Sequence, residues 1–163
     1  MMILTLLIGQ AIAEPPKFDM VGGFRMGYGY VANSELRSPH VMVLGWDQMY
    51  SLDTNTSLDV IVAGNISVGG VNQGEILPSA HLIIGYQLWD SLQFGVGPVV
   101  TFSEFDPVVK SRLNMITAMG WNIEMGDFYI PLHAAYVPDV DGRWRAYLTT
   151  GMNWPLGKKD SME

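Results

Sequence analysis

The sequence predicts an all-β fold, namely an eight-stranded antiparallel up-and-down transmembrane β-barrel. Three observations lead to this prediction. Apolar residues alternate with polar or small ones in eight segments, the connections between them alternate between long and short, and aromatic residues gather near the segment ends. Because the side chains of a strand point alternately to its two faces, each segment is predicted to be a strand with one apolar face.

The clearest example is the stretch 80–102, AHLIIGYQLWDSLQFGVGPVVTF. Ile84 and its neighbours at every second position form a large apolar face, and the alternation resumes after a polar reversal at 89–92. Two alternating runs joined by a tight polar turn are typical of a β-hairpin. The rest of the chain repeats this unit.

The remaining strands are predicted at 17–31, 40–50, 58–68, 113–124, 128–136 and 144–154. The connections after the first, third, fifth and seventh strands are long, and those after the second, fourth and sixth are short. Outer-membrane barrels show this asymmetry, with short periplasmic turns and long external loops.

Aromatic residues give an independent indication. They form two bands, one near each end of the predicted strands, as the girdles at the two membrane interfaces do. The periplasmic band comprises Phe18, Tyr50, Trp89, Phe94, Trp121, Phe128 and Trp154, and the outer band comprises Tyr28, Tyr30, Phe102, Tyr136 and Trp144.

Composition narrows the class of protein further. Charged residues make up 15% of the chain, well below the ~25% of typical soluble domains. The net charge of −7 and the lack of any Lys or Arg cluster argue against nucleic acid as a partner. Without cysteine there is no disulfide framework or thiolate metal site, and we predict neither a metal site nor a cofactor.

The ends of the chain are predicted to lie outside the barrel. Residues 1–13 resemble a secretory signal peptide, with an apolar core at 2–8 and a small-x-small end at 11–13, although the positive n-region is missing and the true start codon stays open. Residues 14–156 are assigned to the barrel and the charged stretch 157–163 to a disordered tail. The expected location is the outer membrane of a Gram-negative cell.

One face of the strands carries glycine, asparagine and arginine. This pattern fits a narrow barrel lumen better than the core of a soluble sandwich, where Arg25 or Glu124 would be costly to bury. We expect a hydrogen-bonded polar network that plugs the lumen, with a gated polar path as the alternative. Its members are Arg25, Asn65, Gln87, Asn114, Asn122, Glu124 and Arg145.

In strand number, loop asymmetry and signal peptide, the chain resembles the small eight-stranded outer-membrane barrels, which include OmpX-like, OmpW-like, PagP-like and PagL-like proteins. The resemblance covers nearly the whole chain but rests on no diagnostic motif. It therefore implies an architecture rather than an activity.

Two families of that group modify lipid A. The deacylase family, PagL, uses a His-x-Ser-Asn motif, and its nearest match here, His133-Ala134-Ala135-Tyr136, lacks the nucleophilic hydroxyl. The palmitoyltransferase family, PagP, is similar at Gly85-Tyr86 and at Tyr136-Val137-Pro138. Of its Asp-Ser pair only the serine is matched, by Ser67, because Ile66 stands in place of the aspartate, and Arg25 stands in place of its first-strand histidine. If either activity is present, the candidate catalytic residues are Ser67, Ser79, His81 and His133.

The leading functional prediction is a non-enzymatic barrel with a structural, adhesive or small-ligand-binding role through its external loops. Its expected partners are outer-membrane lipids and lipopolysaccharide, and it is expected to be a monomer. As a hypothesis, the loop carboxylates Glu35, Glu75, Glu104 and Asp106 share divalent cations with lipopolysaccharide phosphates.

Two alternatives stay open at this point. One is a lipid A acyltransferase or deacylase on the same scaffold. The other is a soluble lipocalin-like lipid binder, which requires the apolar face containing Ile84 to point inward. Pore activity and the ligand or substrate also stay open.

Overall fold

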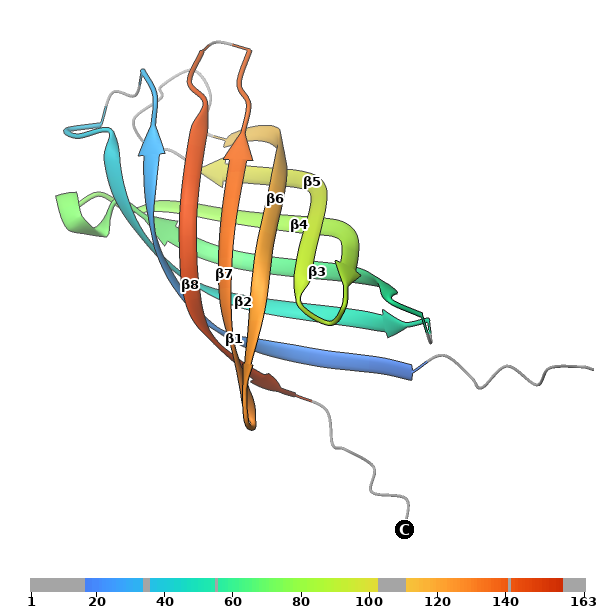
Figure 1. The fold of residues 1–163 in the computed structure, drawn as a ribbon. Helices are drawn as coiled ribbons and strands as arrows, with labels where there is room; N and C mark the ends of the chain where they lie inside the picture. Colours follow the sequence, from blue (N-terminus) through green and yellow to red (C-terminus); the bar gives the residue numbers. More distant parts are fainter. Residues whose placement is uncertain (1–16, 34–35, 55, 103–110, 141, 157–163) are drawn as a thin grey trace, which may run out of the picture.

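The computed structural model describes residues 17–33, 36–54, 56–102, 111–140 and 142–156, and these residues form one closed barrel (Figure 1). The predicted eight-stranded antiparallel barrel is confirmed. Its strands are β1 (Lys17–Val31), β2 (His40–Asp53), β3 (Leu58–Gly69), β4 (Leu77–Leu88), β5 (Leu92–Phe102), β6 (Ser111–Met125), β7 (Phe128–Val137) and β8 (Arg145–Pro155). A short 3₁₀-helix, η1 (Val71–Gln73), lies in the connection between β3 and β4.

Each strand pairs antiparallel with its neighbours in sequence, and the pairing of β1 with β8 closes the sheet. That last ladder runs from Val21↔Pro155 to Val31↔Arg145. Closure leaves no edge strand, which is the condition under which a β-sheet can lie in lipid. We call the end with the long connections the outer end, and the end with the short turns the inner end.

Several strands extend beyond their predicted ranges, and β2 and β4 extend furthest at one end. β2 continues to Asp53, where it pairs with Lys17, and β4 begins at Leu77, which pairs with Gly69. The sequence gives a turn signal at Pro78 and Ser79, but the partner strand β3 is long enough to hold these residues in the ladder. The predicted signal peptide and tail, 1–13 and 157–163, lie outside the described residues.

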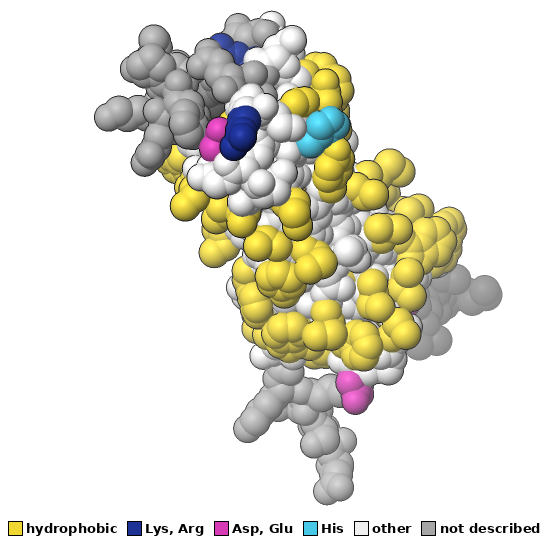
Figure 2. Space-filling model, turned by 90° about the vertical axis from the view of Figure 1, so that its left-hand side faces the viewer, with side chains coloured by type: hydrophobic (Ala, Val, Ile, Leu, Met, Phe, Trp, Pro, Cys, Tyr) yellow, Lys and Arg dark blue, Asp and Glu magenta, His cyan; other side chains and the backbone are white. Residues whose placement is uncertain are grey.

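The apolar face of every strand points outward. Ile84 in β4, Val96 in β5 and Leu148 in β8 are 58%, 52% and 56% exposed. Figure 2 shows a broad field of apolar side chains on one face of the barrel, with charged side chains visible only near its two ends. The soluble lipocalin-like interpretation needed Ile84 inside and is therefore wrong. No helix in the described part of the chain is long and apolar enough to cross a membrane.

Aromatic rings meet across strands in the outer band. The ring centroid of Trp144 lies 5.3 Å from that of Tyr30 and 6.0 Å from that of Tyr136, and Tyr28 stacks on His40 at 5.6 Å. Rings with one apolar and one polar part suit the interface between lipid tails and water. The contacts thus join β1, β2, β7 and Trp144, the residue before β8, where the belt is expected to end.

Two ladders are interrupted beside prolines. The β4–β5 ladder stops after His81↔Val99 and resumes at Ile84↔Val96, next to Pro98. The β7–β8 ladder is broken in the same way next to Pro131. Proline has no N–H to donate, so each break follows directly from the residue type.

Glycine on the inner face lets neighbouring strands approach closely. A Cβ placed on Gly85 would lie 2.0 Å from the backbone oxygen of Phe94 in the facing strand. By contrast, Gly64 faces outward, and a Cβ there would meet nothing within 4 Å. Only the first position needs glycine for its packing.

Gly85→Ala is expected to lower the free energy of unfolding by about 1–3 kcal/mol, because the backbone of β5 must move away. Gly64→Ala is the matched control and is expected to change it by less than about 1 kcal/mol. Urea unfolding of the protein in lipid vesicles, followed by the heat-modifiable shift in gel mobility, measures both. Equal stabilities of the two variants would contradict the close approach.

Ile84→Lys tests whether the outward face lies in lipid. A lysine near the bilayer midplane of a β-barrel costs about 2–4 kcal/mol, whereas a lysine on a water-exposed surface costs about 0.5 kcal/mol or less. Val71→Lys, at an exposed position in η1 of the outer end, is the control. The same measurement should show a large decrease in the free energy of unfolding for Ile84→Lys and a small one for Val71→Lys. A small decrease for both variants would mean that the belt lies in water.

Candidate functional site

The inner faces of the strands form a lumen that is polar at several buried positions. These side chains occupy the alternate positions opposite the apolar belt, so the same pattern that makes the belt also fills the lumen. The buried polar residues are Arg25, Asp47, Asp59, Gln87, Gln93, Asn122, Arg145 and Asn153.

An ion pair between β1 and β2 lies in the wall of the lumen. Arg25 donates from Nε to Asp47 Oδ2 at 3.2 Å, and its Nη2 also donates to Asp47 Oδ2. Both side chains are less than a tenth exposed. Buried charges need a partner of opposite sign, because removing them from water is costly. Arg25 was expected in the lumen from the sequence. Asp47 was missed, although it lies on the inward face of β2.

The inner half of the lumen is closed by a chain of hydrogen bonds. Gln93 donates from Nε2 to Gln87 Oε1 at 2.6 Å, and its Oε1 lies 2.9 Å from His133 Nε2. The imidazole lies over Gly120, where a Cβ would be 1.9 Å from His133 Cδ2. The absence of a side chain at Gly120 is therefore what makes room for this hydrogen bond.

Arg145 lies near the outer end of the lumen. It donates from Nη1 to the hydroxyl of Thr101, and Asn114 accepts from Nη2 at 3.1 Å in the amide orientation that satisfies both of its atoms. These partners are neutral. Within the described part of the chain, no carboxylate pairs with this guanidinium.

The four candidate catalytic residues all line the lumen, but they do not form a catalytic pair. Ser67 and Ser79 lie opposite each other on β3 and β4, and their hydroxyls hydrogen-bond at 2.9 Å. His81 follows on β4, and His133 bonds Gln93 from the other side of the barrel. No hydrogen bond joins either serine to either histidine among the described residues. A serine nucleophile would need such a base within reach.

The other predicted network members lie at different depths. Asn65 pairs with His81 across β3 and β4 and lines the same space as the serines. Asn122 is buried near the inner end, and its Oδ1 has no partner among the described residues. Glu124 lies at the inner end of β6 and is exposed.

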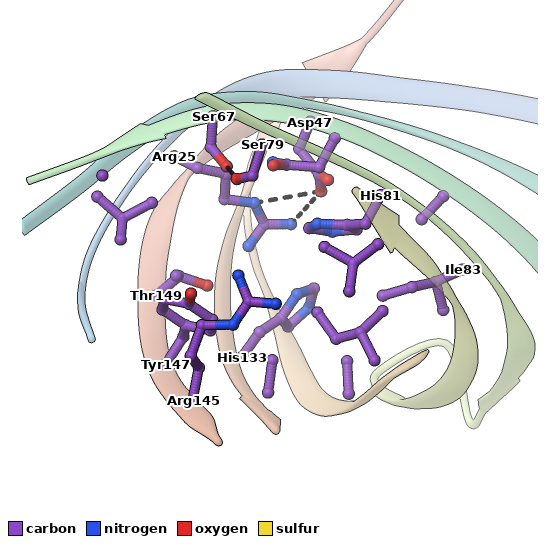
Figure 3. Close-up of a pocket in the computed structure, with 18 of the residues that line it drawn as sticks. Arg25, Asp47, Ser67, Ser79, His81, Ile83, His133, Arg145, Tyr147 and Thr149 are labelled. Carbon is purple, nitrogen blue, oxygen red and sulfur yellow. Dashed lines mark hydrogen bonds and ion pairs between the residues drawn. The ribbon is translucent and has the colours of Figure 1, made fainter. Parts of the chain in front are cut away.

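A cavity of about 230 Å³ occupies the lumen above the Gln93–His133 floor and reaches Leu36 and Arg143 at the outer end (Figure 3). Its wall is mostly apolar. The buried residues Ile83, Val99 and Ile116 pack together on one side, and the polar groups of the wall include Arg25, Arg143 and Arg145. The sequence did not predict this cavity, because its volume depends on how far the closed sheet opens between its walls.

The outer end also carries a connection held firmly against the barrel. Gln73 of η1 donates from Nε2 to the backbone oxygens of Ser38 and His40 at 2.9 and 2.8 Å and accepts from Ser38 N at 2.8 Å. Asn72 accepts from Met42 N at 2.9 Å. These bonds fasten the β3–β4 connection to the start of β2.

No group of three or more His, Cys, Asp or Glu able to hold a metal occurs among the residues that the structure describes. Of the loop carboxylates suggested for shared divalent cations, Glu35, Glu104 and Asp106 lie outside those residues. Glu75 lies in the connection after η1, partly buried.

No protein-family model and no curated protein matches the sequence. Among solved structures, the chain is similar to the crystal structure of Ail, the attachment invasion locus protein of Yersinia pestis, with 12% identity over 85% of this chain and 97% of Ail and a TM-score of 0.52. The backbone structure of the Yersinia pestis outer membrane protein Ail in a phospholipid bilayer nanodisc gives 12% identity, 84% and 99% coverage, and a TM-score of 0.49.

At this level of identity the likeness shows the fold alone. The predicted resemblance to small outer-membrane barrels is confirmed at that level, while the finer resemblances to OmpX, OmpW and PagP stay predictions. The chain has the fold of an eight-stranded outer-membrane β-barrel.

Proposed function

We propose that this chain is a non-enzymatic barrel of the bacterial outer membrane that acts through its outer end, as an adhesive surface. The apolar belt supports the location, since a closed sheet with apolar residues outside and polar residues inside is built for a bilayer. Outer-membrane lipids and lipopolysaccharide are its proposed neighbours, and a monomer suffices because closure leaves no unpaired strand.

The observation that carries this proposal is an ordered surface at the outer end, where a connection is hydrogen-bonded to the barrel and apolar side chains are exposed. Asn72 and Gln73 fasten the β3–β4 connection to the barrel, and exposed apolar side chains lie in this connection and in the one between β7 and β8. Val71, Ile76 and Val140 are 49%, 66% and 102% exposed. Exposed apolar side chains at this end are available for contact with a partner surface. The structurally similar Ail is by its name an attachment protein, which agrees with this role.

The lumen offers less support for the alternative activities. Its inner half is closed by Gln87, Gln93 and His133, which argues against a permanently open pore. The mutual hydrogen bond of Ser67 and Ser79 argues against a lipid A acyltransferase or deacylase, because neither hydroxyl is placed on a base.

The adhesive role can be tested with bacteria that express the protein on an otherwise unchanged outer membrane. Expression should raise the number of cells retained on an epithelial monolayer. The triple variant Val71→Asp, Ile76→Asp and Val140→Asp should remove most of that gain, because carboxylates disfavour an apolar contact. Met125→Asp makes the same change at an exposed position of the inner end and should leave retention unchanged. Retention by the triple variant equal to wild type would refute the role of the outer end.

Lipid A from expressing and non-expressing cells should give the same mass spectrum. This expectation follows from the missing serine–histidine pair in the lumen. The gain or loss of one acyl chain would overturn the non-enzymatic proposal. In that case Ser67→Ala, Ser79→Ala and His133→Ala would show which group performs the chemistry.

A further inference from the structure

In the cavity of the outer half of the lumen, one buried N–H donor, on Arg25, has no acceptor among the described residues. Arg25 is 4% exposed, and its Nε and Nη2 are both occupied by Asp47. Its Nη1 is buried and has no hydrogen-bond partner among the described residues. A buried N–H that is left unpaired costs free energy, so this atom is a place where an acceptor would bind.

A second guanidinium faces the same space. Figure 3 shows the side chains of Arg25 and Arg145 pointing into the cavity, Arg25 from β1 and Arg145 from the paired strand β8. Asp47 balances the charge of Arg25, whereas the described hydrogen-bond partners of Arg145, Thr101, Asn114 and Tyr147, are hydroxyl and amide groups. Of the described charged residues that line the cavity, Arg25, Arg143 and Arg145 are positive and Asp47 and Asp139 are negative. One positive charge is in excess, and a monoanion between Arg25 and Arg145 would neutralise it.

The remaining wall is apolar. Ile83, Val99 and Ile116 are each less than a tenth exposed and pack together on one side of the cavity. A small inorganic ion would leave this wall in contact with empty space or water. An amphipathic molecule would cover the apolar wall and satisfy the arginines at the same time.

We propose that the lumen binds a small amphipathic carboxylate, which enters from the outer end. Its carboxylate lies between Arg25 Nη1 and Arg145, and its short apolar chain packs against Ile83, Val99 and Ile116. An apolar cavity of about 150 Å³ holds benzene, so the 230 Å³ found here is enough for a chain of about six carbons. A planar guanidinium group can bind a carboxylate through two hydrogen bonds, and the single charge of a carboxylate matches the one positive charge in excess among the described lining residues.

This site is separate from the exposed surface at the outer end, so the inference goes beyond the proposed adhesive role. Failure of the adhesion experiment would leave it untouched. Failure of the binding experiment below would likewise leave adhesion untouched.

The test is isothermal titration of hexanoate into the protein in phospholipid nanodiscs, with empty nanodiscs titrated in parallel. We expect saturable binding to the protein with one site. Hexan-1-ol, which keeps the chain without the charge, and acetate, which keeps the charge without the chain, should each bind at least about tenfold more weakly.

Three variants locate the site. Arg145→Met should weaken hexanoate binding at least about tenfold, and Ala118→Leu should do so by filling the cavity without touching either arginine. Arg37→Met removes an exposed positive charge of the outer end that does not line the cavity, and it should bind as wild type does. The double variant Arg25→Met and Asp47→Leu removes one charge of each sign, so the net charge of the lumen is unchanged, and it should also lose binding.

Each variant is first shown to be folded by its heat-modifiable gel mobility. Heat signals equal to those of empty nanodiscs would overturn the proposal, because they indicate partition into the bilayer only. Equal affinities for hexanoate and hexan-1-ol would overturn the role of the arginines. Unchanged binding by folded Arg145→Met and by the double variant would place the ligand elsewhere.

Discussion

The hydrogen bonds between β1 and β8 are the interaction on which the rest of this structure depends, because they turn a chain of hairpins into a sheet without edges. In lipid no water is present to satisfy backbone N–H and C=O groups, so an open edge there would be strongly unfavourable. Closure also separates the two faces of every strand. Each outward residue belongs to the belt and each inward residue to the lumen, which is why Ile84 and Gln87, three positions apart, meet such different surroundings.

Inside the closed sheet, polarity and space are distributed unevenly. Near the inner end, Gln87, Gln93 and His133 satisfy one another and close the lumen. Toward the outer end, the walls leave a cavity that Arg25 and Arg145 line. A narrow barrel of this kind can be rigid at one end and receptive at the other, because the two halves are filled by different residues of the same strands.

The sequence predicted the strands and their inward faces because alternation is a local property that one strand shows by itself. Arg25, Asn65 and Gln87 were placed in the lumen on that basis. The partnership of Arg25 with Asp47 was not predicted, because it depends on the register between β1 and β2, which pairs Arg25 with Gly45 and brings Asp47 diagonally beside it. The hydrogen bond of His133 to Gln93 joins strands that are not adjacent, so only the closed barrel reveals it. The cavity and the contacts of Gln73 depend on tertiary structure in the same way.

The interrupted ladders beside Pro98 and Pro131 have a mechanical consequence for the wall of the barrel. They divide the wall into two groups of strands, β5 to β7 and β8 with β1 to β4. Within each group the pairing is continuous. When the surrounding bilayer bends or thins, the strain concentrates at the two seams, since fewer hydrogen bonds resist it there. The barrel then deforms as two stiff plates joined by hinges, and its cross-section flattens rather than shrinking evenly.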